Sequence, residues 1–501
     1  MLHAFCAIIL GILAFLTGCA ASAPPATVAI SAPPQWYAPL PAVAPSGQPS
    51  TTSSLPHQGS LTGLSDWWAQ QADPLLVELI TAAQSASPSV VTARSNIEQA
   101  RASRAVSEAA LLPKLDVAAT LSRSMSAPVN RTVIPPIVNF GQVSPQTSWE
   151  LDLFGQNRAR VNADSERLLG SEALWHEARI LVAAEVASQY YSWRACTQLL
   201  QGVQADAASR LETARLTGLL SQAGLGAPAT TALARASAAE ASSRLTQQRT
   251  QCELGVKTLV GLTAWAEPVL RLKLQAAPSG GTPHRTVNVA AVPAAVLAQR
   301  PDIFNAERAL NAASFEVGSA RAQRYPRLSL SGNVGYNETK TRGFTQRFST
   351  WSVGPVALTV PIFDGGASLA NLDAAKARYD AAAGQYRGAV RQAVREVEEA
   401  LVNLQSTADR TIDARTAAEG YVVSLAAIEA RFKAGLASLF ELEDARRSQL
   451  AALASVINLE LERTNAWIAL YKAVGGGWTP DAPHANPMVF EIPEAALPAW
   501  P

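Results

Sequence analysis

Charged residues are scarce in this chain. Asp, Glu, Lys and Arg make up 16% of its 501 residues, against roughly 25% in a typical soluble domain. The formal net charge is only +1. This balance argues against a nucleic-acid-binding protein, because such proteins need a basic surface to neutralise phosphates. We therefore expect no nucleic-acid partner.

Residues that carry chemistry are also few. The five histidines are scattered without the spacing of metal ligands, and the chain has no glycine-rich phosphate loop and no Ser/His/Asp arrangement. With three methionines, a methionine relay for copper is unsupported. We therefore predict that the protein is not an enzyme, and that it has no catalytic residues, no cofactor and no metal site.

Long apolar runs are missing beyond the N-terminus. Apolar residues make up 48% of the chain, and much of this share is alanine, which suits closely packed helices. No run reaches the length of about 18 residues that a transmembrane helix needs. A membrane-spanning part would therefore have to be a closed β-barrel.

Residues 1–18 have the pattern of a signal peptide. The apolar stretch Phe5–Leu16 is too short to span a membrane, and small residues stand directly before Cys19. This arrangement resembles the lipobox of bacterial lipoproteins, which implies that Cys19 is acylated and becomes the new N-terminus. Ala20 resembles the signal that sorts lipoproteins to the outer membrane. The alternative is an ordinary signal peptide with a chance cysteine, since no Lys or Arg precedes Phe5.

Most of the chain consists of two copies of one unit. Pro88–Arg94 aligns with Pro301–Glu307, and the same spacing of 213 residues aligns Leu112–Leu115 with Tyr325–Leu328. In each copy, apolar residues at helical spacing end at a proline and give way to strand-like alternation. The predicted organisation is a tether at 19–60, a first repeat at 61–263, a linking segment at 264–300, a second repeat at 301–478 and a proline-rich tail at 479–501.

Each repeat is predicted to contain two strands and a long helical hairpin. The predicted strands lie at about 113–125, 143–154, 326–339 and 350–363, and the hairpin tips at about 223–228 and 434–438. No proline interrupts Ala367–Lys433, so this helix would be on the order of 100 Å long. Such a length is typical of a coiled-coil rod.

The predicted fold class is therefore mainly α with a β-barrel contribution. The repeating unit is helix, strand, strand, long helix, turn and helix. Four strands cannot close a barrel, for which about eight is the usual small number. Oligomerisation would have to complete it, and three chains would supply twelve strands.

Four motifs carry a family resemblance. They are Ser148–Gly155, Arg300–Ile303, Pro361–Gly366 and Leu470–Trp478. In this order and spacing, together with the lipobox, the chain resembles the TolC-like outer-membrane efflux proteins, in their lipoprotein (OprM/NodT-like) branch. The likeness covers nearly the whole mature chain.

The resemblance implies a homotrimer anchored to outer-membrane lipid by its acyl group. A 12-stranded outer-membrane β-barrel would sit on a long periplasmic helical barrel, with an equatorial region that includes about Ala264–Gln299. The implied function is a passive exit duct, joined by a periplasmic adaptor (a membrane fusion protein) to an inner-membrane RND-type transporter. The alternatives are a lipid-anchored periplasmic coiled-coil scaffold or adaptor, and a duct for protein secretion or metal efflux.

The resemblance also implies a gate beyond the second tip. Asp444 and Arg447 match family gate positions, Glu441 shares their helix face, and Phe440 takes the place of an apolar gate residue. Carboxylates about 6 Å apart around a threefold axis would repel by roughly 1–3 kcal/mol per pair. From spacing alone, Glu441, Asp444 and Arg447 describe a solvated stripe of ion pairs, and the match to the family at Asp444 and Arg447 is what favours a gate.

The two turns offer further candidate sites. The resemblance implies that Gly224, Leu225, Gly435 and Leu436 are the adaptor-docking tips, although a helix turn needs a glycine in any case. Cys196 and Cys252 lie equally far from Gly224 along the chain. An antiparallel hairpin would place them at one height, so they are either a disulfide or two buried free thiols.

Overall fold

The structure is a computed structural model that describes residues 23–28, 33, 35–38, 67–70, 73–125, 137–276, 297–341 and 343–478. The predicted signal peptide 1–18, the acylation site Cys19, most of the tether and the tail 479–501 lie outside the described residues. So does much of the linking segment. The predicted fold class is confirmed in that the described chain is mainly helical with one antiparallel sheet.

The described residues form two compact units, and each unit takes parts of both repeats. Unit 1 contains the described residues of Met1–Ala32, Ser87–Arg179 and Asp302–Ala393, and unit 2 those of Pro33–Ala86, Ile180–Pro301 and Val394–Pro501. The predicted repeats are therefore units of sequence. The compact units instead group corresponding parts of the two repeats.

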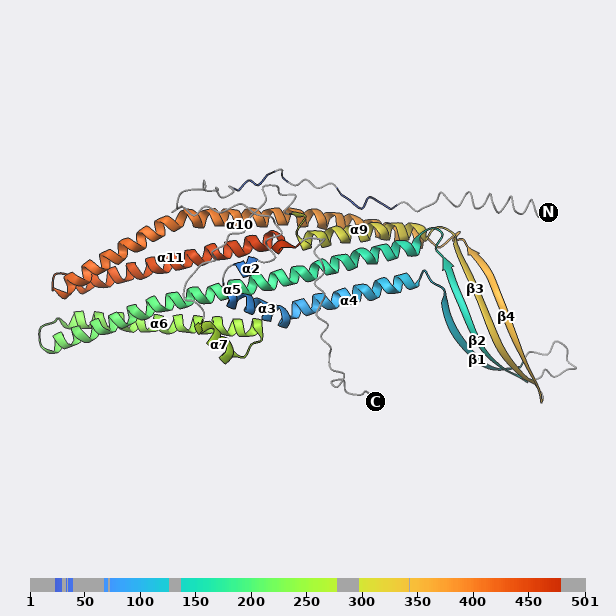
Figure 1. The fold of residues 1–501 in the computed structure, drawn as a ribbon, viewed down its shortest axis with the longest axis horizontal. Helices are drawn as coiled ribbons and strands as arrows, with labels where there is room; N and C mark the ends of the chain where they lie inside the picture. The colour runs from blue at the N-terminus through green and yellow to red at the C-terminus, as the bar shows by residue number, and fades with distance from the viewer. Residues whose placement is uncertain are drawn as a thin grey trace. The chain divides into compact units, whose positions relative to one another are not determined.

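The sheet of unit 1 follows chain order (Figure 1). Its strands are β1 (Lys114–Met125), β2 (Ile137–Leu151), β3 (Arg327–Thr341) and β4 (Phe344–Thr359), all paired antiparallel in the order β1-β2-β3-β4. The sheet consists of two β-hairpins, β1–β2 and β3–β4, which are joined by the pairing of β2 with β3. Strands β1 and β4 are the edges, so each has one side without a strand partner among the described residues.

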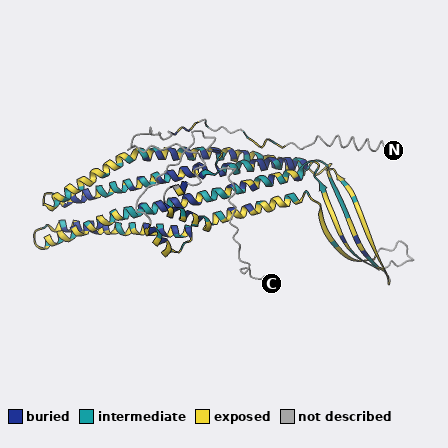
Figure 2. Ribbon diagram, in the orientation of Figure 1, coloured by how far each residue is buried: buried dark blue, intermediate teal, exposed yellow. Residues whose placement is uncertain are grey.

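The sheet has two chemically different faces. Residues that pair across strands share a face of the sheet. Much of the sheet is exposed (Figure 2), and its exposed apolar side chains lie on one face. These are Leu115, Val117, Leu121, Val143, Trp149, Val334, Tyr336, Trp351, Val353, Val356 and Leu358. The opposite face is polar, as in the cross-strand row Asp116, Gln146, Asn333 and Ser352.

Strands β2 and β4 are displaced from their predicted ranges. Both begin about six residues before the predicted start, at Ile137 and Phe344. The backbones of these first residues pair with the neighbouring strands, but their polar side chains and glycine obscure the apolar–polar alternation from which a strand is predicted. Strand β2 ends at Leu151 because the Asp152 carboxylate instead accepts hydrogen bonds from backbone N–H groups at the start of the next helix. Strand β4 ends at Thr359, shortly before Pro361, which cannot donate to a ladder.

Two helical hairpins follow the strands. Helix α5 (Gln156–Gln222) returns through α6 (Pro228–Thr263), and α10 (Ala367–Lys433) returns through α11 (Leu439–Ala473). Helix α10 coincides with the predicted long helix, and Pro228 opens α6 as its first residue. The shorter elements are α2 (Trp67–Gln70), α3 (Pro74–Ala86), α4 (Pro88–Ala109), α7 (Glu267–Ala276), α9 (Pro301–Ala322) and η2 (Gly475–Gly477). Within the described ranges, none of the helices combines the length and apolar character needed to cross a membrane.

Two of the sequence motifs meet inside unit 2. The buried Arg300 side chain donates through Nη1 to the carbonyl of Ala473 (2.7 Å) and through Nη2 to Glu396 (2.8 Å). Gly475 is buried with a φ of +83°, and a side chain there would overlap the backbone of Gln299. The start of the second repeat is thereby fixed against the end of α11.

Candidate functional site

The two hairpin tips have the same backbone geometry. Gly224 and Gly435 both have a φ of +73°, a left-handed conformation that favours glycine. The N–H of Leu225 donates to the carbonyl of Leu220, and that of Leu436 to the carbonyl of Arg431, each at 2.8 Å. This pattern of hydrogen bonds is the Schellman ending of a helix, so helix-turn chemistry alone accounts for the two glycines.

The leucines after these glycines are not explained by the turn. In a Schellman ending, the residue in this position often packs against its own helix. Leu225 is instead 77% exposed and Leu436 70% exposed. Each tip thus presents an apolar side chain to its surroundings, and the predicted role of the four tip residues in docking stays a prediction.

Glu441 stabilises the beginning of α11. Its Oε2 accepts from the backbone N–H of Ser438 at 2.6 Å, while its own N–H donates to Ser438 Oγ at 3.2 Å. This reciprocal arrangement is a capping box. The hydrogen bonds to Ser438 lower the pKa of Glu441. The cap is therefore fully formed at neutral pH and is lost as the pH falls through the lowered pKa of this carboxyl.

The other predicted gate residues lie on the surface of the single chain. Asp444 Oδ1 and Arg447 Nη1 are 3.8 Å apart, and their side chains are 63% and 67% exposed. Phe440 is 72% exposed. This is the geometry of a solvated pair one helical turn apart, and it also leaves all three side chains available to a neighbouring chain. Their role in a gate stays a prediction.

A buried ion network lies beside these exposed residues. Glu443 Oε2 accepts from Ser237 Oγ (2.6 Å) and from Arg210 Nη1, and Glu443 Oε1 accepts from Arg446 Nη1 (3.1 Å). The residues Glu443, Arg210 and Arg446 are 6%, 3% and 7% exposed. One carboxylate on α11 therefore joins α5 and α6 of the first hairpin.

Further polar groups complete this network. Asp206 Oδ1 accepts from Arg210 Nε at 2.9 Å, Thr213 Oγ1 accepts from Arg446 Nη1 at 3.0 Å, and Glu429 of α10 lies 3.6 Å from Arg446. Arg210 and Arg446 each retain one buried nitrogen without a hydrogen-bond partner. Buried charges need such compensation, because desolvation costs several kcal/mol per ion.

Sequence reasoning missed this network although a signal existed. Glu443 and Arg446 follow Leu439 by four and seven residues, a spacing that places them on the apolar face of α11. A charged residue at such a position is rarely buried unless it is paired. The identity of the partner was not readable, because 233 residues separate Arg210 from Glu443.

The structure joins Cys196 and Cys252 by a disulfide. Their Cα atoms are 5.6 Å apart, and the bond links α5 to α6 across 56 residues of chain. Both thiols thus meet at one height of the first hairpin. A covalent link between the two arms limits how far they separate in the unfolded chain.

We predict that breaking this disulfide weakens the first hairpin. Removing the cross-link from a loop of this length costs about 4 kcal/mol in the chain-entropy model, with a usual range of roughly 2–5 kcal/mol. The unfolding temperature of the Cys196→Ser, Cys252→Ser double variant should fall, and reductant should lower that of the wild type but not of the variant. Thiol labelling of unreduced, unfolded wild type at both positions would contradict the link.

The comparisons with known proteins identify the class. A tandem repeat with two long helical hairpins and a four-stranded sheet is the architecture of outer-membrane efflux channels. The outer membrane efflux protein family matches residues 79–264 and 292–476. The chain therefore belongs to this family, and the resemblance noted from the sequence motifs is confirmed.

Similar proteins are spread over several bacteria. The chain is 30% identical over 431 residues to outer membrane protein OprJ of Pseudomonas aeruginosa, covering 84% of this chain and 88% of that protein. It is 29% identical over 413 residues to the solvent efflux pump outer membrane protein SrpC of Pseudomonas putida, covering 81% and 86%. The fold of the Campylobacter jejuni CmeC outer membrane channel matches with a TM-score of 0.78 at 24% identity, covering 92% and 96%.

No metal-binding geometry accompanies this fold in the part of the chain that the structure describes. There, no group of three or more His, Cys, Asp or Glu side chains is arranged to hold a metal ion. The polar side chains that do converge are ion pairs between helices, such as the Glu443 network. These ion pairs hold neighbouring helices together, as the Glu443 network holds α11 to α5 and α6.

Proposed function

We propose that the protein is the outer-membrane exit channel of a tripartite efflux pump and that it works as a homotrimer. The sheet of unit 1 carries this proposal. Its exposed apolar face suits lipid, its polar face suits a water-filled interior, and its two edges need partners, because unpaired backbone groups are costly in lipid. Pairing β4 of one copy with β1 of the next in a ring of three would complete twelve strands.

The proposed partners follow from the place of an exit channel in a tripartite pump. The hairpin tips, with Leu225 and Leu436, would dock a periplasmic adaptor, which connects the channel to an inner-membrane RND-type transporter. Cys19 would anchor each copy to outer-membrane lipid. The transport of solutes out of the cell is supported by relatives named as outer-membrane proteins of efflux pumps.

Trimerisation and conduction test the proposal together. The purified full-length protein should run on a gel as a trimer that converts to a monomer on boiling, and it should form discrete channels in planar bilayers. A periplasmic scaffold or adaptor would give neither result. A monomer that forms no channels would reject the proposed function.

We predict that Asp444→Ala widens the proposed gate. In a trimer, the three Asp444–Arg447 pairs would surround the axis near the tip, so removing the carboxylate should weaken the links across the opening. Single-channel conductance in planar bilayers should rise at least about twofold. The matched control is Asp373→Ala, since Asp373 forms a similar exposed i,i+3 ion pair with Lys376 near the end of α10 that lies away from the tip. Unchanged conductance in Asp444→Ala would remove this residue from the gate.

A further inference from the structure

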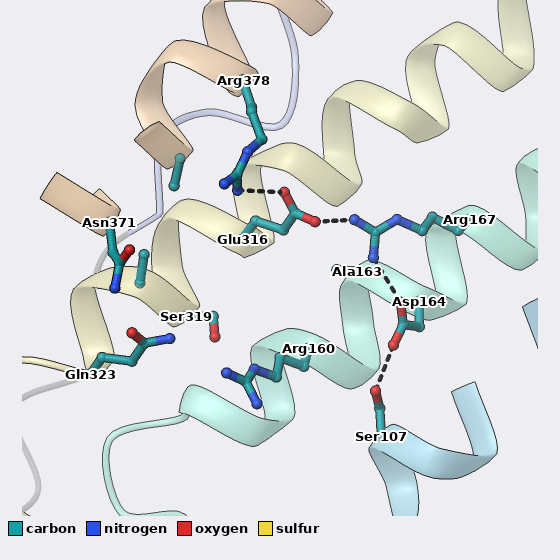
Figure 3. Close-up of a pocket in the computed structure, with 12 residues that line it drawn as sticks. Ser107, Arg160, Ala163, Asp164, Arg167, Glu316, Ser319, Gln323, Asn371 and Arg378 are labelled. Atoms are coloured by element: carbon teal, nitrogen blue, oxygen red, sulfur yellow. Dashed lines mark hydrogen bonds and ion pairs between the residues drawn. The ribbon is translucent and has the colours of Figure 1, made fainter. Parts of the chain in front are cut away.

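A polar cavity of about 440 Å³ lies within unit 1 (Figure 3). Its lining comes from α4, α5, α9 and α10. The four helices are neighbours: Ser107 of α4 hydrogen-bonds Asp164 of α5 (2.5 Å), and Glu316 of α9 pairs with Arg167 of α5 and Arg378 of α10. The cavity is therefore a hollow on one side of the layer that these four helices form.

The charges in the cavity are unequal. It contains three guanidinium groups, Arg160, Arg167 and Arg378, and two carboxylates, Asp164 and Glu316. Arg167 donates to both carboxylates, and Arg378 lies 3.8 Å from Glu316. Arg160 is the unpaired charge of the cavity. Among the described residues, it has no hydrogen-bond or ion-pair partner.

On α9, the N-terminal segment and the cavity lie on opposite sides of the helix. Ser314 Oγ donates to the carbonyl of Pro24 at 2.6 Å, and Tyr379 OH donates to that of Pro25 at 2.8 Å. On α9, Ser314 precedes the cavity residue Glu316 by two positions, which is about 200° around the helix. The segment that leads from the proposed lipid anchor thus contacts one side of α9, and the cavity lies on the other. On α10 the two are adjacent, because Tyr379 follows the cavity residue Ala375 by one helical turn.

We infer that Arg160 is the unpaired cation of an anion-binding site on the inner wall of the channel. This inference rests on the proposed homotrimer, which would place three hollow faces around one lumen. A guanidinium fork matches a carboxylate bidentately. Figure 3 shows that the neutral polar groups of Ser319, Gln323 and Asn371 line the same cavity. The ligand class is therefore anionic solutes that carry carboxylates, and the three sites together raise the local concentration of anions.

Ion selectivity in planar bilayers tests this inference. Reversal potentials in a KCl gradient give the ratio of chloride to potassium permeability. Removing one charge per copy at distances of about 10 Å, with screening at 0.1 M salt, should lower this ratio roughly twofold in Arg160→Gln. Arg160→Lys keeps the charge and should keep the ratio. Citrate in the bath should reduce the chloride current of the wild type more than that of Arg160→Gln.

A matched control lies on the same helix layer. Arg387 is exposed and stands nine residues after Arg378, which places it on the opposite side of α10, so Arg387→Gln should leave the ratio unchanged. If Arg160→Gln conducts with the ratio of the wild type, the anion site is rejected while the exit channel stands. If the wild type forms no channels, the proposed function fails, and the anion site fails with it.

Discussion

The Glu443→Ala variant is expected to lose about 3–5 kcal/mol of stability in the packing of the two hairpins. The carboxylate lies between Arg210 and Arg446, all three being buried. Its removal leaves two desolvated guanidinium groups without their shared counter-charge. The cost is large because three hydrogen bonds to a buried carboxylate are lost together, which leaves Arg210 with Asp206 and Arg446 with Glu429 as their remaining charged partners.

The neighbouring residue provides the matched control. Asp444 is also acidic and is next in the chain, but its side chain is 63% exposed, and exposed ion pairs contribute at most about 1 kcal/mol. Unfolding of the detergent-solubilised protein and trypsin cleavage near the tips should therefore change strongly in Glu443→Ala and little in Asp444→Ala. Equal behaviour of the two variants would show that the network carries no stability.

A conservative replacement separates charge from shape. Glu443→Gln retains an oxygen that accepts from Ser237 but removes the charge that compensates Arg210 and Arg446. We expect a stability between those of the wild type and Glu443→Ala. A glutamine variant as stable as the wild type would mean that the hydrogen bonds suffice. Because this network ties α11 to α5, any movement that separates the two hairpins must break it.

Local signals explain which features could be predicted. Helix α10 was readable because nothing in Ala367–Lys433 breaks a helix, and Pro228 marked the start of α6 because its missing N–H costs nothing there. The spacing of Ser438 and Glu441 also indicates a capping box, whereas the sequence predicts for this carboxylate either a gate charge or a place in a solvated stripe of ion pairs. Glu441 thus caps the start of α11, a structural role that the resemblance to the family does not indicate.

Long-range contacts explain what was missed. Arg446 is a partner of Glu443 on its own helix, but Arg210 and Ser237 come from two helices of the other repeat, and only the packed fold brings them to Glu443. The early starts of β2 and β4 are set by backbone hydrogen bonds between strands, which the sequence of polar side chains does not indicate. The polar cavity around Arg160 needs four helices from both repeats, so spacing within any one helix could not indicate it.

Gly475→Ala is expected to destabilise unit 2 by at least about 3 kcal/mol. The added Cβ would overlap the Gln299 carbonyl oxygen and would lie 3.0 Å from the Gln299 carbonyl carbon and 3.1 Å from Arg300 Cα. These are backbone atoms, and they are fixed because Arg300 is anchored to Ala473 and Glu396. The φ of +83° at Gly475 adds strain for any residue with a side chain.

The contrasting variant is Gly420→Ala, at an exposed position in the last third of α10. There a Cβ would meet nothing within 4 Å, and alanine favours a helix over glycine by about 0.5–1 kcal/mol. Thermal unfolding followed by circular dichroism should therefore move in opposite directions, downward for Gly475→Ala and slightly upward for Gly420→Ala. A Gly475→Ala protein as stable as the wild type would show that residues 299–300 yield to the side chain. The contact between the end of the linking segment and the end of α11 would then be looser than the buried Arg300 hydrogen bonds require.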